Sequence, residues 1–139
     1  MHVNAEAELR EILSLKTVAV LGCSTTPEKA AHTVPKYLLD HGYDVIPINP
    51  FADEIFGRQA YDSLDEVPDD IDIVNVFRPS EEVPTIVDEV LTRHTDRGDV
   101  EAVWLQLGIR DDEAADRAVE AGLDVVQDRC LKVEHQRLR

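Results

Sequence analysis

The residues with the clearest chemistry follow an apolar segment near the start of the sequence. The run Thr17–Gly22 is rich in β-branched residues, and the hydroxyl residues Ser24, Thr25 and Thr26 and the cation Lys29 come soon after it. A tight turn, hydroxyl donors, a cation and the N–H groups of a following helix are the groups that bind an anion. The stretch indicates either a phosphate-binding turn or a polar loop that only caps a helix.

The glycine pattern of this turn departs from two common nucleotide-binding motifs. A dinucleotide-binding turn requires G-x-G-x-x-G, of which only Gly22 is present, and a P-loop requires glycine and lysine where Pro27 and Glu28 stand. The second strand of a dinucleotide binder ends in an acid that binds the ribose, whereas here it ends in Asn49 and Pro50. These departures disfavour an NAD(P)-binding oxidoreductase or redox-sensing domain, which stays as the alternative.

Apolar segments and helical segments alternate along the whole chain. This alternation predicts βαβ units and one α/β domain over residues 1–139, with a Rossmann-like, doubly wound, mostly parallel sheet. Residues 57–68 are irregular, with at most a short strand and one helical turn. We expect a leading helix within residues 1–15 and a short polar tail at 131–139. The predicted strands are 17–22, 43–50, 71–77, 101–108 and 123–130, and the other helices are 34–42, 79–98 and 110–122.

Two residues suggest where the predicted helices at 34–42 and 79–98 begin. Pro35 is tolerated only in the first turn of its helix, because proline lacks the N–H group that later turns need. Ser80 has the hydroxyl of a preferred N-cap for the helix that contains Pro84.

The residues just after each predicted strand are the candidate site, because ligands of such sheets bind beyond the carboxyl ends of the strands. Arg78 either contacts a ligand phosphate or pairs with Glu81 or Glu82. Gln106 either lines the site or satisfies backbone groups. At the last strand end, Cys130 is either a reactive thiol beside a cation or a structural cysteine next to an Asp–Arg pair.

Composition limits the partners and the compartment. The net charge is −15, from 29 acidic and 14 basic residues, so the surface repels nucleic acid and anionic membranes. The acid excess with few lysines favours an acidic protein from a halophile. There is no apolar run of membrane-span length and no signal-peptide pattern, which predicts a cytoplasmic location. Cys23 and Cys130 form no metal-binding or disulfide motif.

Several motifs in order resemble the CoA-binding domain family, the Rossmann-like domain found at the start of succinyl-CoA ligase alpha subunits. The matching stretches are VAVLGCS, KYLLDHGYDVIPINP, GRQAYDSLDEVPDDIDIVNVFR, VWLQLG, EAGLDVVQDRC and EHQRL. The resemblance covers about Leu9 to Leu138, and the order and spacing of the motifs make it specific. It implies coenzyme A or an acyl-CoA as the ligand.

The resemblance also implies which residues bind. The first turn would receive the CoA pyrophosphate beside Lys29, Asn49 and Pro50 would border the adenosine, and Phe77 with Arg78 would close the opposite side. The expected cofactor-binding residues are Gly22, Cys23, Ser24, Thr25, Lys29, Asn49, Pro50, Phe77, Arg78 and Gln106.

Two residues depart from the family pattern, Cys23 and Leu131, the second of which stands where some members have proline. Cys23 stands where alanine is common; we expect a helix N-terminus and Lys29 to favour its thiolate, and we assign it no catalytic role. The ligase subunit of the resembling family has a second domain with a phosphorylated histidine, which we do not expect in this sequence, so ligase activity is not implied. The prediction is therefore a CoA-binding protein without evident catalytic machinery, with a second copy or another protein left open as a partner.

Overall fold

The five predicted strands form one parallel sheet in the computed structural model, which describes residues 1–139. The strands lie in the order β2-β1-β5-β6-β7, so the chain runs outward in both directions from the pair β1 and β5. The central strands are buried on both faces, as their continuous apolar runs predict. The strand bounds are β1 Thr17–Leu21, β2 Asp44–Ile48, β5 Ile73–Val76, β6 Ala102–Leu105 and β7 Asp124–Val126.

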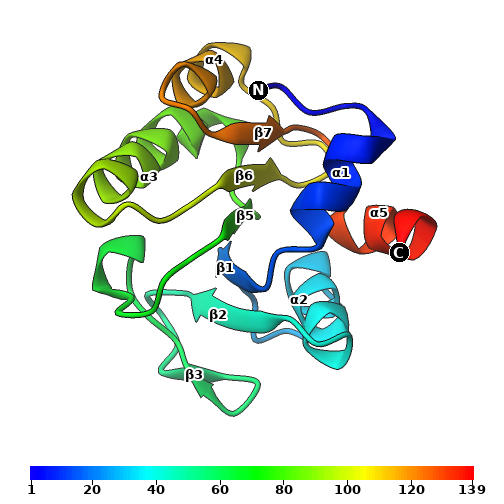
Figure 1. Ribbon diagram of the computed structural model, residues 1–139. Helices are drawn as coiled ribbons and strands as arrows, with labels where there is room; N and C mark the ends of the chain where they lie inside the picture. The colour runs from blue at the N-terminus through cyan, green and yellow to red at the C-terminus, as the bar shows by residue number, and fades with distance from the viewer.

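Helices cover both faces of this sheet (Figure 1). Helices α1, α2 and α5 pack on one face, and α3 and α4 pack on the other, each layer over its own buried apolar cluster. The arrangement confirms the predicted Rossmann-like α/β fold. None of the helices is both long and apolar enough to cross a bilayer. The helix bounds are α1 Glu6–Leu13, α2 Ala30–Asp40, α3 Val83–Arg97, α4 Asp112–Glu120 and α5 Leu131–Leu138.

The connection between β2 and β5 contains no α-helix. It consists of a small hairpin and one 3-10 turn, β3 (Glu54–Ile55), β4 (Arg58–Gln59) and η1 (Leu64–Glu66). A second 3-10 turn, η2 (Ser80–Glu82), leads into α3. Because a full helix is missing here, space remains between this connection and α3 on one face of the sheet.

Arg93 of α3 attaches this connection to the helix at one end. Its guanidinium donates to the carbonyl oxygens of Leu64 at 2.7 Å, Val67 at 3.0 Å and Asp69 at 2.8 Å. The same group forms an ion pair with Asp99 at 2.9 Å, and both side chains are almost completely buried. These bonds fix the connection relative to α3.

The C-terminal segment corrects one prediction, because residues 131–138 form helix α5 where we expected a polar tail. Leu131 and Leu138 are buried on the face that packs against the other helices, and so is Glu134. The Glu134 carboxylate accepts hydrogen bonds from Arg129 at 2.8 Å and Arg137 at 3.0 Å. Burial raises the pKa of Glu134, but these two arginines outweigh that effect and hold the pKa below its usual value. The charged residue can therefore occupy a core position.

The predicted helix starts also need correction. Helix α2 begins at Ala30, so Pro35 lies inside the helix and not in its first turn. Helix α3 begins after Glu82, and Ser80 does not cap it. The Ser80 hydroxyl instead accepts the backbone N–H of Arg110 at 3.0 Å, which ties the start of the α3 region to the loop after β6.

Candidate functional site

The strand register aligns three predicted site residues at the carboxyl edge of the sheet. Leu21 at the end of β1 lies opposite Ile48 of β2 and Val76 of β5, so the next residues are Gly22, Asn49 and Phe77. Backbone bonds continue beyond the strands at this level, from Gly22 N–H to the Ile48 carbonyl at 3.1 Å and from Phe77 N–H to the Leu21 carbonyl at 2.8 Å. Loops that are distant in sequence therefore converge on one point.

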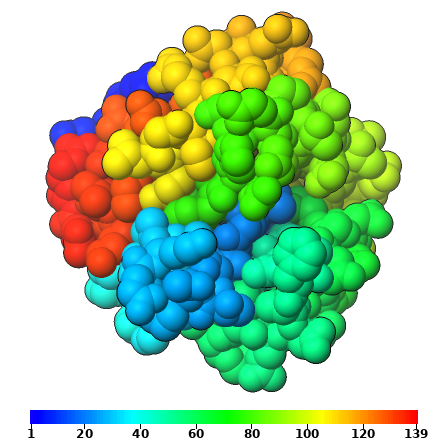
Figure 2. Space-filling view, turned by 180° about the vertical axis from the view of Figure 1, so that it is seen from behind, coloured from blue at the N-terminus to red at the C-terminus, as the bar shows by residue number.

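An open cavity of about 600 Å³ lies at this point. Figure 2 shows the face on which the segments after β1, β2 and β5 gather around a hollow. The cavity extends between the β2–β5 connection and α3, where the connection lacks a helix. Eight of the ten predicted binding residues line it: Gly22, Cys23, Ser24, Lys29, Asn49, Pro50, Phe77 and Arg78.

The turn after β1 is held in shape by Pro35. A proline at this position cannot donate to the carbonyl four residues earlier, which belongs to Ala31. The freed Ala31 carbonyl accepts the backbone N–H of Ser24 at 3.0 Å. The Ser24 hydroxyl in turn accepts the N–H of Thr26 at 3.0 Å. The proline inside α2 thus contributes the bond that fixes the first turn against its own helix.

This turn retains donors for an anion. The backbone N–H groups of Cys23 and Thr25 have no acceptor within the chain, and neither have those of Ala30 and Ala31 at the start of α2. The first N–H groups of a helix have no partner within the helix itself and favour negative charge. Lys29 stands at the N-cap position of α2, lines the cavity and forms no ion pair. The turn is therefore suited to bind a phosphate.

Gly22 is required by both its conformation and its surroundings. Its φ of +86° lies in the left-handed region that side chains disfavour. A Cβ atom here would lie 2.8 Å from the Phe77 carbonyl oxygen and 2.9 Å from Cδ of Arg78. The glycine lets the first turn lie directly against the segment that follows β5.

Asn49 connects the ends of β1 and β2 through its side-chain amide. Its Nδ2 group donates to the Cys23 carbonyl at 2.9 Å, and its Oδ1 atom accepts the N–H of Phe51 at 2.8 Å. An aspartate could not make the first of these bonds, since an ionised carboxylate has no donor. Asn49 thus positions the first turn and the turn after β2 as well as lining the cavity.

Arg78 has an ion-pair partner at the cavity wall. Its guanidinium donates to both carboxylate oxygens of Glu82, with Nε at 3.1 Å and Nη2 at 2.7 Å. The hydrogen bond to Glu82 raises the pKa of Arg78, and the same bond lowers the pKa of Glu82. Both side chains are about half exposed, so a competing anion can reach this arginine from the cavity.

Cys23 is a buried thiol and not a thiolate. Burial raises its pKa to about 12, although a hydrogen bond from the Ser24 backbone lowers it in part. The expectation that the helix and Lys29 favour the thiolate is therefore wrong, because removal from water has the larger effect. The side chain belongs to the apolar cluster beneath α2 and α5.

The other two predicted binding residues do not reach the cavity. Thr25 is exposed on the turn, and Gln106 is buried beyond the end of β6. The Gln106 Oε1 atom accepts from Asn75 Nδ2 at 3.3 Å and from the N–H of Leu131 at 3.4 Å. Gln106 thus connects β5 to the start of α5, which is the second of the two roles considered for it.

The end of β7 is also held by structural contacts. Asp128 accepts the N–H of Gly108 at 2.6 Å, and Arg129 pairs with Glu134, so the expected Asp–Arg pair is absent. Cys130 is half-buried at the start of α5 and forms no disulfide.

The sequence did not predict the wall that the α3 region contributes to the cavity. Four α3-side residues line it, Glu82, Thr85, Ile86 and Glu89, whose spacing of three, four and seven residues marks one helical face. Burial and the charge of Asp65 raise the pKa of Glu89. The helical spacing is visible in the sequence, but the contact with the β2–β5 connection is not. The connection adds Asp62 and Ser63, and the turn after β2 adds Phe51.

The sequence matches a known family over most of its length. The family model described as the CoA binding domain matches residues 16–136. The chain is 42% identical over 136 residues to YneT, an uncharacterized protein of Bacillus subtilis, and the match covers 97% of each. A solved Thermus thermophilus structure, cell-free ID.343, superposes with a TM-score of 0.90 and 45% identity, covering 98% of this chain and 100% of that one.

A much longer protein matches only in part. An acetate–CoA ligase (ADP-forming) of Methanocaldococcus jannaschii is 40% identical over 82 residues. The match spans 59% of this chain and 12% of the ligase.

Proposed function

We propose that this chain, which belongs to the CoA-binding domain family, binds coenzyme A or an acyl-CoA in the cavity at the carboxyl edge of its sheet. The observation that carries the proposal is the convergence of two cations and the unpaired N–H groups of the first turn on one cavity that also has apolar walls. In this arrangement the CoA pyrophosphate lies against Gly22–Ser24 with Lys29 and Arg78, and the adenosine lies beside Asn49 and Pro50.

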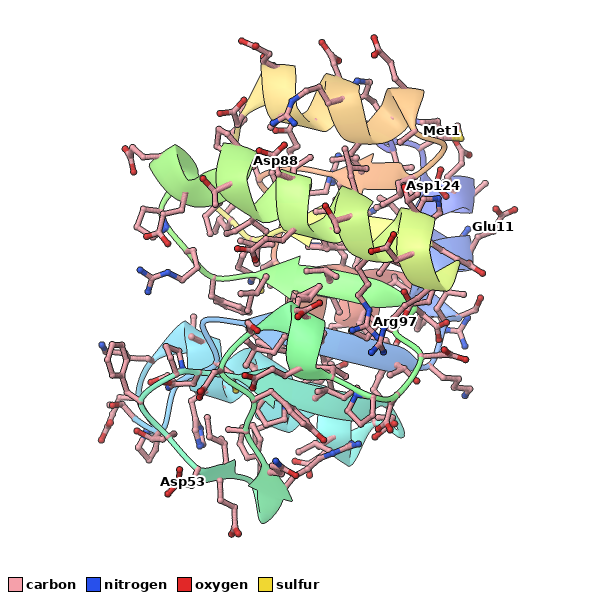
Figure 3. All side chains as sticks on the ribbon, turned by 90° about the vertical axis from the view of Figure 1, so that its left-hand side faces the viewer. Met1, Glu11, Asp53, Asp88, Arg97 and Asp124 are labelled. Atoms are coloured by element: carbon pink, nitrogen blue, oxygen red, sulfur yellow. The ribbon has the colours of Figure 1, made fainter.

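The end of β2 supports CoA over NAD. NAD-binding sheets place an acid there to accept the ribose hydroxyls. Here Asn49 occupies the position, and both ends of its amide bond to the protein. Asp53, the next acid along the chain, lies beside the small hairpin and does not line the cavity (Figure 3). Asp62 of the β2–β5 connection also lines the cavity, so the 3′-phosphate that CoA carries on its ribose would lie toward the cations and away from this acid.

We infer a binding role and not the complete ligase reaction. The matched segment is a small part of the acetate–CoA ligase relative, whose activity belongs to the longer protein. The thiol at the cavity, Cys23, is protonated at neutral pH because burial raises its pKa to about 12. A protonated, buried thiol is a poor nucleophile, which supports packing as the role of this residue.

Native mass spectrometry of gently purified protein tests the proposal. We expect a non-covalent adduct with the mass of CoA or an acyl-CoA, either retained from the cell or formed after CoA is added. The double variant Lys29→Ala, Arg78→Ala is the control and should lose the adduct while its circular dichroism spectrum stays unchanged. An adduct with the mass of NAD or NADP, or no CoA adduct at saturating CoA, would contradict the proposal.

A further inference from the structure

Phe51 is the most exposed large apolar residue of the protein. Its side chain is 95% exposed, compared with 68% for Leu107, the next of this kind. A single exposed apolar residue is ordinary on a protein surface. Phe51 differs because it lines the cavity that lies at the convergence of the strand ends.

The backbone at Phe51 is fixed although the ring is free. Its N–H donates to Oδ1 of Asn49 at 2.8 Å, and Pro50 precedes it. The amide of Asn49 is itself held by the Cys23 carbonyl at 2.9 Å, so the turn after β2 is tied to the first turn. An ordered turn therefore holds the Phe51 backbone at the cavity, while the ring stays almost fully exposed.

The surroundings of Phe51 suit a neutral, flat group and not a phosphate. The N–H of Asn49 bonds to the Tyr61 carbonyl at 2.9 Å, which brings the following residue, Asp62, beside the same strand end. The carboxylate of Asp62 repels phosphate on this side, whereas Lys29 attracts it at the first turn. Ile48 and Ile86 contribute apolar wall to the cavity.

We propose that the Phe51 ring packs on the adenine of the bound nucleotide and is the side chain that selects ligands with an aromatic base. The inference rests on the proposed function, because it assigns the base of a CoA-type ligand to one side of the same cavity. Bases stack readily on aromatic side chains, and the contact requires no particular hydrogen-bonding edge. Ordering the ring against the base also removes its apolar surface from water.

Calorimetry with two variants tests the assignment. Phe51→Ala should weaken the binding of both CoA and adenosine 3′,5′-bisphosphate by about tenfold. The matched control Leu107→Ala removes an exposed apolar side chain outside the cavity and should change neither affinity. Equal affinity of Phe51→Ala and the unchanged protein for both ligands would overturn the inference and leave the proposed function standing. Absence of CoA binding by the unchanged protein would overturn both.

A fluorescent variant reports the contact directly. Phe51→Trp should keep the affinity for CoA, and its exposed indole should be quenched by CoA and by adenosine 3′,5′-bisphosphate. Inorganic pyrophosphate, which has no ring, should not quench it. The native Trp104 is fully buried and supplies the background, measured in the unchanged protein. Failure of both adenine ligands to quench the indole at saturation contradicts the assignment.

Discussion

The two ends of the space between α3 and the β2–β5 connection are built around arginines with opposite surroundings. At the closed end, Arg93 is 3% exposed and bonds to three carbonyl oxygens and to Asp99. Arg97 adds a bond to the Val67 carbonyl at 2.6 Å, and Figure 3 shows it at the end of α3. At the open end, Arg78 is 47% exposed and its side chain bonds only to Glu82.

This difference separates stability from binding along one helix. The side chains of Arg93 and Asp99 are both almost completely buried, so we expect no ligand to replace this ion pair. Arg78 has a partner that is itself half exposed, and a phosphate can take its place. We therefore expect changes at the closed end to lower stability and changes at the open end to alter affinity.

Arg93→Ala tests the closed end and should have the largest effect. It leaves the Asp99 carboxylate buried without its counter-charge and removes the guanidinium donor from each of three carbonyl oxygens. Breaking one partner of a buried ion pair lowers the free energy of unfolding by about 3–5 kcal/mol. Urea unfolding measures this loss. The control Arg97→Ala removes an exposed guanidinium and should lower the free energy of unfolding by about 1 kcal/mol. Equal losses in the two variants would show that Arg93 is not the fixed point.

Arg78→Ala and Lys29→Ala test the open end. Each variant should lose a charge-assisted bond to phosphate worth about 1.5–3 kcal/mol, which is roughly a 10- to 150-fold loss of CoA affinity. The free energy of unfolding should stay within about 0.5 kcal/mol, as for most surface substitutions. A comparison of CoA with 3′-dephospho-CoA shows which cation binds which phosphate.

Lys36→Ala is the matched control for this pair. Lys36 pairs with Asp40 on α2, outside the cavity, and its loss should leave CoA affinity unchanged. Unchanged affinity in Arg78→Ala and Lys29→Ala as well would remove both cations from the site.

Glu82→Gln should have a smaller effect on CoA affinity, and one of opposite sign. The hydrogen bond from Arg78 lowers the pKa of Glu82, so this carboxylate is charged at neutral pH and competes with phosphate for the guanidinium. Exposed ion pairs are weak, so removing the charge should strengthen CoA binding only modestly, by up to about fivefold. The gain should disappear in the Arg78→Ala background. Weaker binding by Glu82→Gln would mean that Glu82 itself contacts the ligand.

Cys23→Ala should have the smallest effect, although the residue lies in the phosphate-binding turn. Its side chain points into the apolar cluster, and the turn would contact phosphate through backbone groups. CoA affinity should stay within about twofold. Since burial raises the pKa of the thiol to about 12, maleimide labelling of Cys23 at neutral pH should be slow and should slow further with CoA. A thiol-dependent turnover abolished by Cys23→Ala would contradict the binding role.

The sequence predicted the sheet well because its strands are continuous apolar runs that need burial on both faces. It failed at α5, since the charged Glu134 occupies a core position that only Arg129 and Arg137 make tolerable. It wrongly placed Pro35 in a first turn. Inside α2 the proline leaves the Ala31 carbonyl without its helical donor, and the N–H that replaces this donor comes from Ser24, outside the helix, which no helix rule predicts.

The sequence likewise located some residues of the candidate site and not others. Residues that directly follow β1, β2 and β5 could be located from the pattern, since parallel strands end at one edge of the sheet. Gln106 also follows a strand, yet its side chain turns toward Asn75 and away from the cavity. The α3 wall and Asp62 depend on how the β2–β5 connection packs, and no local pattern specifies that packing.

Calorimetry of the unchanged protein with CoA and with NAD⁺, in high salt, tests whether the cavity binds CoA in preference to NAD⁺. The free N–H groups of the first turn, the cations Lys29 and Arg78, and the amide of Asn49 in place of an acid predict that CoA binds and binds more tightly than NAD⁺. Binding of NAD⁺ with no measurable heat from CoA would contradict it.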